Sequence, residues 1–193
     1  MARGPEATRQ RIFDAAFEEF ARHGIAGARI DRIAAAACAN KQLIYAYFGS
    51  KQALFDEVVA IQVARFHREV NFDPDRLPEF AGAAFDFFTD NPQLVRLGSW
   101  HALEPPDGSD RIEAIERSIA ERARALGEAQ EAGRLDKTFA PEVLLSLIVA
   151  LVRTWASATP EFRHTPAEEQ AGRAGRRRAV VEATRRLVSP ARA

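Results

Sequence analysis

The chain of 193 residues has little cysteine and no long apolar segment. Its single cysteine, Cys38, cannot form a disulfide within the chain, which is compatible with a reducing cytoplasm. No run of about 18 apolar residues occurs, so we expect no membrane-spanning helix. The N-terminal stretch MARGPEATRQR lacks the apolar region of a signal peptide. We therefore predict a cytoplasmic protein.

Sequence motifs of catalytic and metal sites are missing as well. The four histidines are scattered along the chain without a His-x-x-x-His spacing: His23, His67, His101 and His164. There is no glycine-rich phosphate loop and no nucleophile elbow. We therefore do not expect an enzyme, a bound metal or a cofactor.

The composition is that of a globular protein, with 47% hydrophobic and 28% charged residues. The net charge is zero, which argues against a protein that coats nucleic acid indiscriminately. Residues 1–51 carry eight Lys or Arg against five Asp or Glu, a net charge of +3, and the rest of the chain carries −3. This distribution fits a protein that presents one end to phosphate groups.

Residues 30–51, IDRIAAAACANKQLIYAYFGSK, predict two short helices separated by a break. Apolar residues recur at helical spacing in both: Ile33, Ala34 and Ala37 in the first, Ile44 and Phe48 in the second. The small alanines permit a close crossing, and Asn40 is a good N-cap for the second helix. Two compact helices joined in this way form a helix-turn-helix, whose second helix can enter the DNA major groove.

The block from Thr8 to about Val59 resembles the N-terminal domain of the TetR (tetracycline-repressor) family of bacterial transcription regulators. The motifs that carry the resemblance are Thr8-Arg9, Ile12-Ala15-Ala16, Phe20-Gly24, Ile33-Ala34-Ala37, Tyr45-Phe48 and Ser50-Lys51. The resemblance implies a helix-turn-helix domain over residues 1–51 and a ligand-binding and dimerisation domain over residues 52–193. It also implies a regulator, most often a repressor.

The sequence departs from the family pattern at three positions. Cys38 stands where the turn usually has glycine, so the backbone there either needs no positive φ or tolerates some strain. We interpret the thiol as packed in the turn, with a redox role as the alternative. Arg29 replaces the usual Ser or Thr N-cap and can instead contact phosphate. Leu43 replaces a small or hydroxyl residue, so no base preference carries over from relatives.

The rest of the chain shows helical periodicity and no strand pattern. We expect further helices over residues 5–24, 50–70, 78–89, 91–103, 110–132, 141–155 and 167–188. In the 110–132 helix we expect five residues to face inward: Ile112, Ile115, Ile119, Ala123 and Leu126. The predicted fold is therefore all-α, with about nine helices in two domains.

Eight residues in and around the second short helix are predicted to contact DNA: Arg29, Asn40, Lys41, Gln42, Leu43, Tyr45, Tyr47 and Lys51. Lys41 can donate to guanine and Gln42 can pair with adenine, whereas Leu43 and Ala46 can contact a thymine methyl group. The resemblance implies that both tyrosines bind phosphate. Alternatives remain open: either tyrosine can pack on the first helix, and Lys41 can be a solvated charge.

The helix opened by Pro141 is apolar nearly all round, so it must be covered on more than one face. A second copy of the chain can supply one cover, and the resemblance implies a homodimer through the last two helices. Burial inside one monomer is the alternative. We predict nine interface residues: Leu144, Leu147, Ile148, Leu151, Trp155, Ala179, Val180, Ala183 and Leu187.

The resemblance also implies a small-molecule inducer, largely apolar, that binds the second domain and releases DNA. Six residues are candidates for its site: Phe66, Phe85, Phe88, Trp100, His101 and Leu103. Ligand pockets are mostly apolar with a few polar groups, although aromatic residues at helical spacing are also typical of a plain core. We predict a ligand-responsive repressor that binds a palindromic operator as a homodimer. The alternative is a helical interaction protein whose helix-turn-helix no longer binds DNA.

Overall fold

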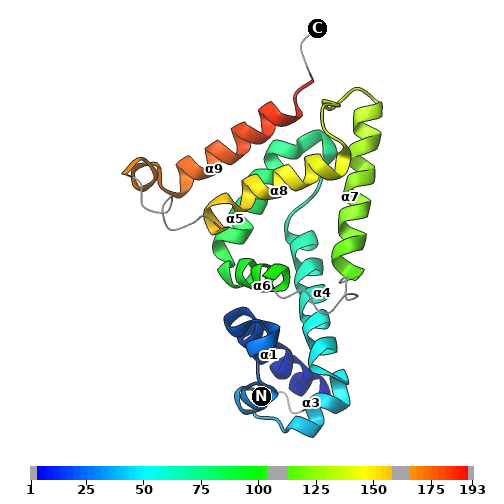
Figure 1. Ribbon diagram of the computed structural model, residues 1–193, viewed down its shortest axis with the longest axis vertical. Helices are drawn as coiled ribbons and strands as arrows, with labels where there is room; N and C mark the ends of the chain where they lie inside the picture. The colour runs from blue at the N-terminus through cyan, green and yellow to red at the C-terminus, as the bar shows by residue number, and fades with distance from the viewer. Residues whose placement is uncertain (1–3, 104–112, 158–165, 191–193) are drawn as a thin grey trace. The chain divides into compact units, whose positions relative to one another are not determined.

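The computed structural model describes residues 4–103, 113–157 and 166–190, and all regular elements within them are helical (Figure 1). The helices are α1 (Pro5–Gly27), α2 (Ile30–Ala36), α3 (Lys41–Phe48), α4 (Lys51–Glu69), a 3-10 turn η1 (Pro74–Arg76), α5 (Leu77–Asp90), α6 (Pro92–Leu103), α7 (Glu113–Glu131), α8 (Pro141–Ser157) and α9 (Pro166–Val188). The predicted all-α class is confirmed. No helix among these residues has the length and apolar character needed to cross a membrane.

The chain forms two compact units. The first comprises Met1–Ala64 and Gln93–Ala114, and the second comprises Arg65–Pro92 and Ile115–Ala193. Helix α4 therefore contributes residues to both units. The units describe packing rather than independent folding, so the domain boundary that we predict after residue 51 stays a prediction.

The first unit is organised around the apolar face of α1. Ile12, Ala16 and Phe20 of this helix are fully buried, and the Phe20 ring meets that of Phe55 from α4 edge-on at 5.2 Å between centroids. We predict that α1 ends at Gly24; instead Gly24 (φ 65°) interrupts the helix, which resumes and reaches Gly27. Glycine adopts such a positive φ without steric cost. The break changes the direction of the chain just before α2.

The second unit is built around α5, which packs against α8 and α9. Helix α9 passes closest at Gly82, where an added Cβ would lie only 2.8 Å from Arg177 Nη2 and 3.0 Å from Val181 Cγ2. A larger residue at position 82 would require the Arg177 and Val181 side chains to shift. Seven residues of α5 are buried: Leu77, Phe80, Ala81, Gly82, Ala84, Phe85 and Phe87.

One prediction for α7 is wrong. Ile119, which we expect to face inward, is 47% exposed, whereas Ala123 and Leu126 are buried as predicted. Among the described side chains of α7, full burial begins only at Ala123, and Ile115 is half-buried. Periodicity identifies the apolar side of a helix but not the length over which a neighbour covers it. Ile112 lies outside the described residues.

Candidate nucleic-acid interface

Helices α2 and α3 form a helix-turn-helix whose second helix is capped at both ends. The Asn40 side-chain Oδ1 accepts a hydrogen bond from the Leu43 N–H at 2.7 Å, which confirms the predicted N-cap. At the other end Gly49 (φ 77°) stops α3, and Ser50 Oγ accepts from the Ala53 N–H at 3.0 Å to cap α4. Ile44 and Phe48 are buried against the rest of the first unit. These contacts fix the axis and the rotation of α3.

The turn between the two helices is strained at Cys38, which has φ 51° and is exposed. Of the two alternatives for this position, the backbone therefore adopts a positive φ and tolerates the cost to an L-residue. Our interpretation of the thiol as packed in the turn is wrong because its side chain faces solvent. Ala37, immediately before it, is the residue that packs, with 1% exposure.

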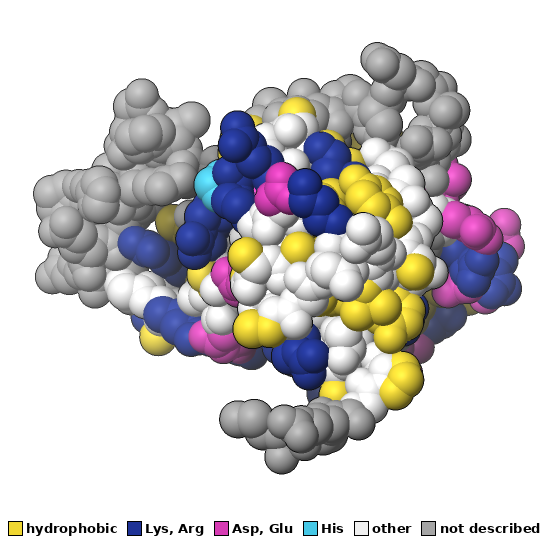
Figure 2. Space-filling view, turned by 90° about the horizontal axis from the view of Figure 1, so that it is seen from below, with side chains coloured by type: hydrophobic (Ala, Val, Ile, Leu, Met, Phe, Trp, Pro, Cys, Tyr) yellow, Lys and Arg dark blue, Asp and Glu magenta, His cyan; other side chains and the backbone are white. Residues whose placement is uncertain are grey.

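The outward face of α3 carries the side chains that we predict to meet DNA. Lys41, Gln42, Tyr45 and Ala46 are exposed, and so is Arg29 at the start of α2. Leu43, Tyr47 and Lys51 are half-buried. Viewed from below, this end of the chain shows Lys and Arg side chains around uncharged and hydrophobic ones (Figure 2). The arrangement offers both phosphate-binding charge and neutral surface for base edges.

Besides the capping residue Asn40, three of the predicted DNA contacts already have partners within the first unit. Lys41 forms an ion pair with Asp31 of α2. The Lys51 ammonium donates to the Ala28 carbonyl at 3.4 Å. The Tyr47 hydroxyl donates to the Pro5 carbonyl at 3.4 Å, which fits the alternative that Tyr47 packs on the first helix. Tyr45, 48% exposed, is therefore the better placed of the two tyrosines to reach a phosphate.

Glu19 of α1 positions the start of α2, a role that we do not predict from the sequence. Its Oε1 accepts from the Arg29 N–H at 2.9 Å and from Arg32 Nε at 2.7 Å. Burial would raise the pKa of Glu19, but the hydrogen bonds from Arg32 and the Arg29 N–H outweigh it and hold this pKa below its ordinary value. The carboxylate therefore holds the N-cap residue Arg29, whose own side chain makes no capping hydrogen bond. The partners are ten and thirteen residues away, so no local pattern reveals them.

The Asp31–Lys41 pair gives a direct prediction. Asp31→Asn is expected to tighten DNA binding by roughly threefold to tenfold, because it frees Lys41 and removes a negative charge beside the recognition helix. Fluorescence anisotropy with the promoter duplex at low and high salt measures the effect. Asp14→Asn, on α1 and hydrogen-bonded to Gln10, is the matched control and should leave affinity unchanged. Weaker binding by Asp31→Asn would contradict the prediction.

The six residues predicted to bind a ligand are divided between the two units. Phe85 and Phe88 line one cavity of the second unit, and Phe66 stacks on Phe88 with 5.3 Å between ring centroids. Trp100 is half-buried and belongs to the first unit. The side chains of His101 and Leu103 lie outside the described residues. Within the part of the chain that is described, no three His, Cys, Asp or Glu residues are grouped to hold a metal ion.

The residues predicted at a dimer interface lie in different environments within the single chain. Leu144, Ile148 and Val180 are buried within the single chain and cannot themselves present surface to a partner. Trp155 lies against Phe85, with 6.3 Å between ring centroids, and lines the cavity just described. Ala179 is exposed. The remaining four predicted residues line an open apolar groove of about 510 Å³ together with Ala150, Thr154 and Arg186: Leu147, Leu151, Ala183 and Leu187.

An all-helical chain with a capped, outward-facing second helix has the features of a helix-turn-helix transcription regulator. Two family models match it: "Bacterial regulatory proteins, tetR family" over residues 12–58 and "Tetracyclin repressor-like, C-terminal domain" over residues 76–186. The chain belongs to the TetR family of bacterial transcription regulators.

Individual relatives agree with this assignment. The chain is 41% identical to the HTH-type transcriptional repressor SCO4008 of Streptomyces coelicolor, over 97% of this chain and 98% of that protein. It is 26% identical to the HTH-type transcriptional repressor NicS of Pseudomonas putida, over 85% and 81% of the two chains. The crystal structure of SCO4942 from Streptomyces coelicolor has a TM-score of 0.81 and 39% identity, and the match covers 94% of this chain and 98% of that one.

Proposed function

We propose that this protein is a ligand-responsive transcriptional repressor that binds a palindromic operator as a homodimer. The observation that carries the proposal is the exposed, doubly capped α3 with Lys41 and Gln42 at its first positions. Two relatives named as repressors, similar over most of the chain, favour repression over activation. In this proposal residues 1–51 read DNA, and residues 52–193 bind the ligand and the second subunit.

The residues predicted to contact DNA divide into base contacts and phosphate contacts. Lys41 and Gln42 contact base edges, where a good pair gives about 1–3 kcal/mol of discrimination. Leu43 contacts a thymine methyl group. The phosphate contacts come from Arg29, Tyr45 and Lys51, the last beside the exposed N–H groups at the start of α4. Tyr47 joins them if its hydroxyl leaves the Pro5 carbonyl.

Dimerisation brings a second helix-turn-helix domain to the DNA. The groove lined by Leu147, Leu151, Ala183 and Leu187 is apolar, and a twofold contact would cover it with the same groove of a second copy. The two helix-turn-helix domains would bind two half-sites separated by about one helical turn of DNA or slightly more. A ligand would release DNA by favouring a state of the dimer in which these domains no longer match that spacing.

Binding to DNA from the protein's own promoter region tests the proposal. We expect a symmetric footprint and an affinity that falls steeply as salt rises, because bound phosphates release counterions. A screen of small compounds by thermal shift, followed by DNA release, tests the ligand response. A protein that shows no salt-dependent binding to promoter DNA would be the helical interaction protein of the alternative interpretation.

A further inference from the structure

A cavity of about 230 Å³ lies within the second unit, between α5, α8 and α9. Its apolar wall is largely aromatic, from Phe85 and Phe88 of α5 and Trp155 of α8. Thr89, Arg173 and Arg176 add polar groups, and Pro92 and Val152 complete the described lining. Pockets for drug-sized ligands have volumes of about 300–1,000 Å³. This cavity is therefore suited to a molecule with a single ring.

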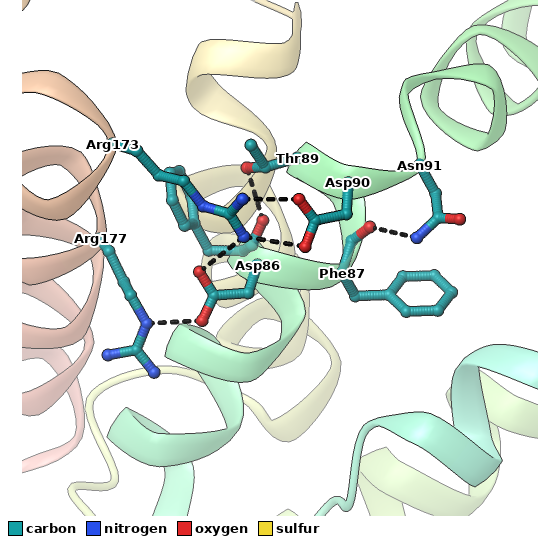
Figure 3. A network of polar contacts seen from close by, with 8 residues as sticks. Asp86, Phe87, Thr89, Asp90, Asn91, Arg173 and Arg177 are labelled. Carbon is teal, nitrogen blue, oxygen red and sulfur yellow. Dashed lines mark hydrogen bonds and ion pairs between the residues drawn. The ribbon is translucent and has the colours of Figure 1, made fainter.

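Two of the three polar residues that line the cavity, Thr89 and Arg173, already form hydrogen bonds within the chain. The Thr89 hydroxyl donates to the Phe85 carbonyl at 2.7 Å. The Arg173 guanidinium donates to both oxygens of Asp90, at 2.6 and 2.9 Å, and to Asp86 Oδ1 at 3.2 Å. Arg177, one turn further along α9, donates to the other Asp86 oxygen at 2.6 Å. Figure 3 shows that these contacts join α9 to α5.

Among the described residues, Arg176 has no carboxylate partner in this network. All four oxygens of Asp86 and Asp90 accept hydrogen bonds from Arg173 or Arg177. The Arg173 hydrogen bonds hold the pKa of Asp90 below its ordinary value, so this carboxylate stays charged and paired at neutral pH. The Arg176 Nε is buried and has no hydrogen-bond partner among the described residues. A guanidinium that lines a cavity with part of its surface buried and no paired carboxylate is costly, and an anion in the cavity would relieve that cost.

We propose that this cavity binds a small single-ring carboxylic acid, with the carboxylate paired to the Arg176 guanidinium and the ring packed among Phe85, Phe88 and Trp155. The inference deepens the proposed function by assigning the charge and size of the ligand, and it rests on that proposal only for the effect on DNA. Among the described residues, the lining and the ion-pair network beside it contain three arginines (Arg173, Arg176 and Arg177) and two aspartates (Asp86 and Asp90), and this excess of positive charge favours an anion. A cation of the same shape is repelled, and a neutral amide gains the ring contacts alone.

Isothermal titration calorimetry of the full chain with benzoate and phenylacetate tests the proposal, with benzamide, phenylacetamide and 2-phenylethylamine as comparisons. We expect an acid to bind at least about tenfold more tightly than its amide, because hydrogen bonds to charged groups are the stronger ones. The amine should not bind. Equal affinity of acid and amide, or no binding of either acid at millimolar concentrations, would overturn the proposal and would leave water as the occupant.

Variants at position 176 locate the binding site. Arg176→Gln should remove the preference for acid over amide, and Arg176→Lys, which keeps the charge but not the Nε–H, should retain only part of it. Arg153→Gln is the matched control, because Arg153 on α8 also has a buried Nε without a partner among the described residues but does not line the cavity. The affinity of Arg153→Gln for the acids should stay within about twofold of that of the unchanged chain. If folded Arg176→Gln binds the acids as tightly as the unchanged chain does, the inference is wrong.

Release of promoter DNA, measured in the same samples, separates the two proposals. If neutral compounds release DNA from the unchanged chain and from Arg176→Gln alike, the repressor function stands and the anion site fails. If phenylacetate binds through Arg176 without affecting DNA, the site stands and the ligand-responsive part of the function fails. Anion-dependent release that Arg176→Gln abolishes would support both.

Discussion

Leu151→Glu is expected to leave the chain folded but monomeric, and to weaken operator binding by at least about a hundredfold. Leu151 lines the apolar groove formed by α8 and α9, and its side chain is only half-buried in the single chain. A glutamate there can remain solvated in the monomer. In a twofold dimer the same position would bury two unpaired carboxylates, which costs several kcal/mol. A monomer then binds each half-site separately and loses the gain from linked binding.

Val149→Glu provides the control for this experiment. Val149 is an apolar residue of the same helix, 36% exposed, and lies two residues from Leu151, which places it about 200° further round α8. The same charge is therefore introduced on a different face. Size-exclusion chromatography with light scattering should give a dimer for Val149→Glu and a monomer for Leu151→Glu. A dimeric Leu151→Glu protein with normal DNA binding would place the subunit contact elsewhere.

The features of this structure that depend on residues close together in the sequence could be predicted. Apolar periodicity locates the helices, since a helix repeats every 3.6 residues whatever it packs against. Asn40 caps α3 as predicted, and Ser50 caps α4 in the same way, because a cap is a contact between residues two or three positions apart. The position of the helix-turn-helix follows from these local signals. Its motifs also carry the resemblance to the TetR family.

The contacts that set the chemistry of the surface could not be predicted in this way. Glu19 joins Arg32, and Asp86 joins Arg173, across 13 and 87 positions of the sequence. Nothing in the local pattern distinguishes these charges from solvated ones. Ile119 shows the related failure for apolar residues, since periodicity does not report where a covering helix ends. Paired charge and true burial appear only once the helices are packed.

Loss of the two polar side chains at the start of α3 should have separable effects on DNA recognition. Gln42→Ala is expected to reduce affinity for the operator by about 1–3 kcal/mol per half-site, with little change in affinity for unrelated DNA, since a base contact is lost. Lys41→Ala should behave in the same way if Lys41 reads a base. If Lys41 instead binds phosphate, its removal weakens all sequences alike and lowers the salt slope by about 0.9 per subunit.

The comparison needs an exposed lysine that does not belong to the unit containing α3, and Lys137, in the second unit, provides it. Lys137→Ala makes the same change in net charge and should leave operator affinity, nonspecific affinity and salt slope unchanged. Anisotropy titrations with operator and scrambled duplexes at several salt concentrations measure all three quantities. Unchanged binding by the Lys41→Ala, Gln42→Ala double variant would mean that α3 does not enter the major groove.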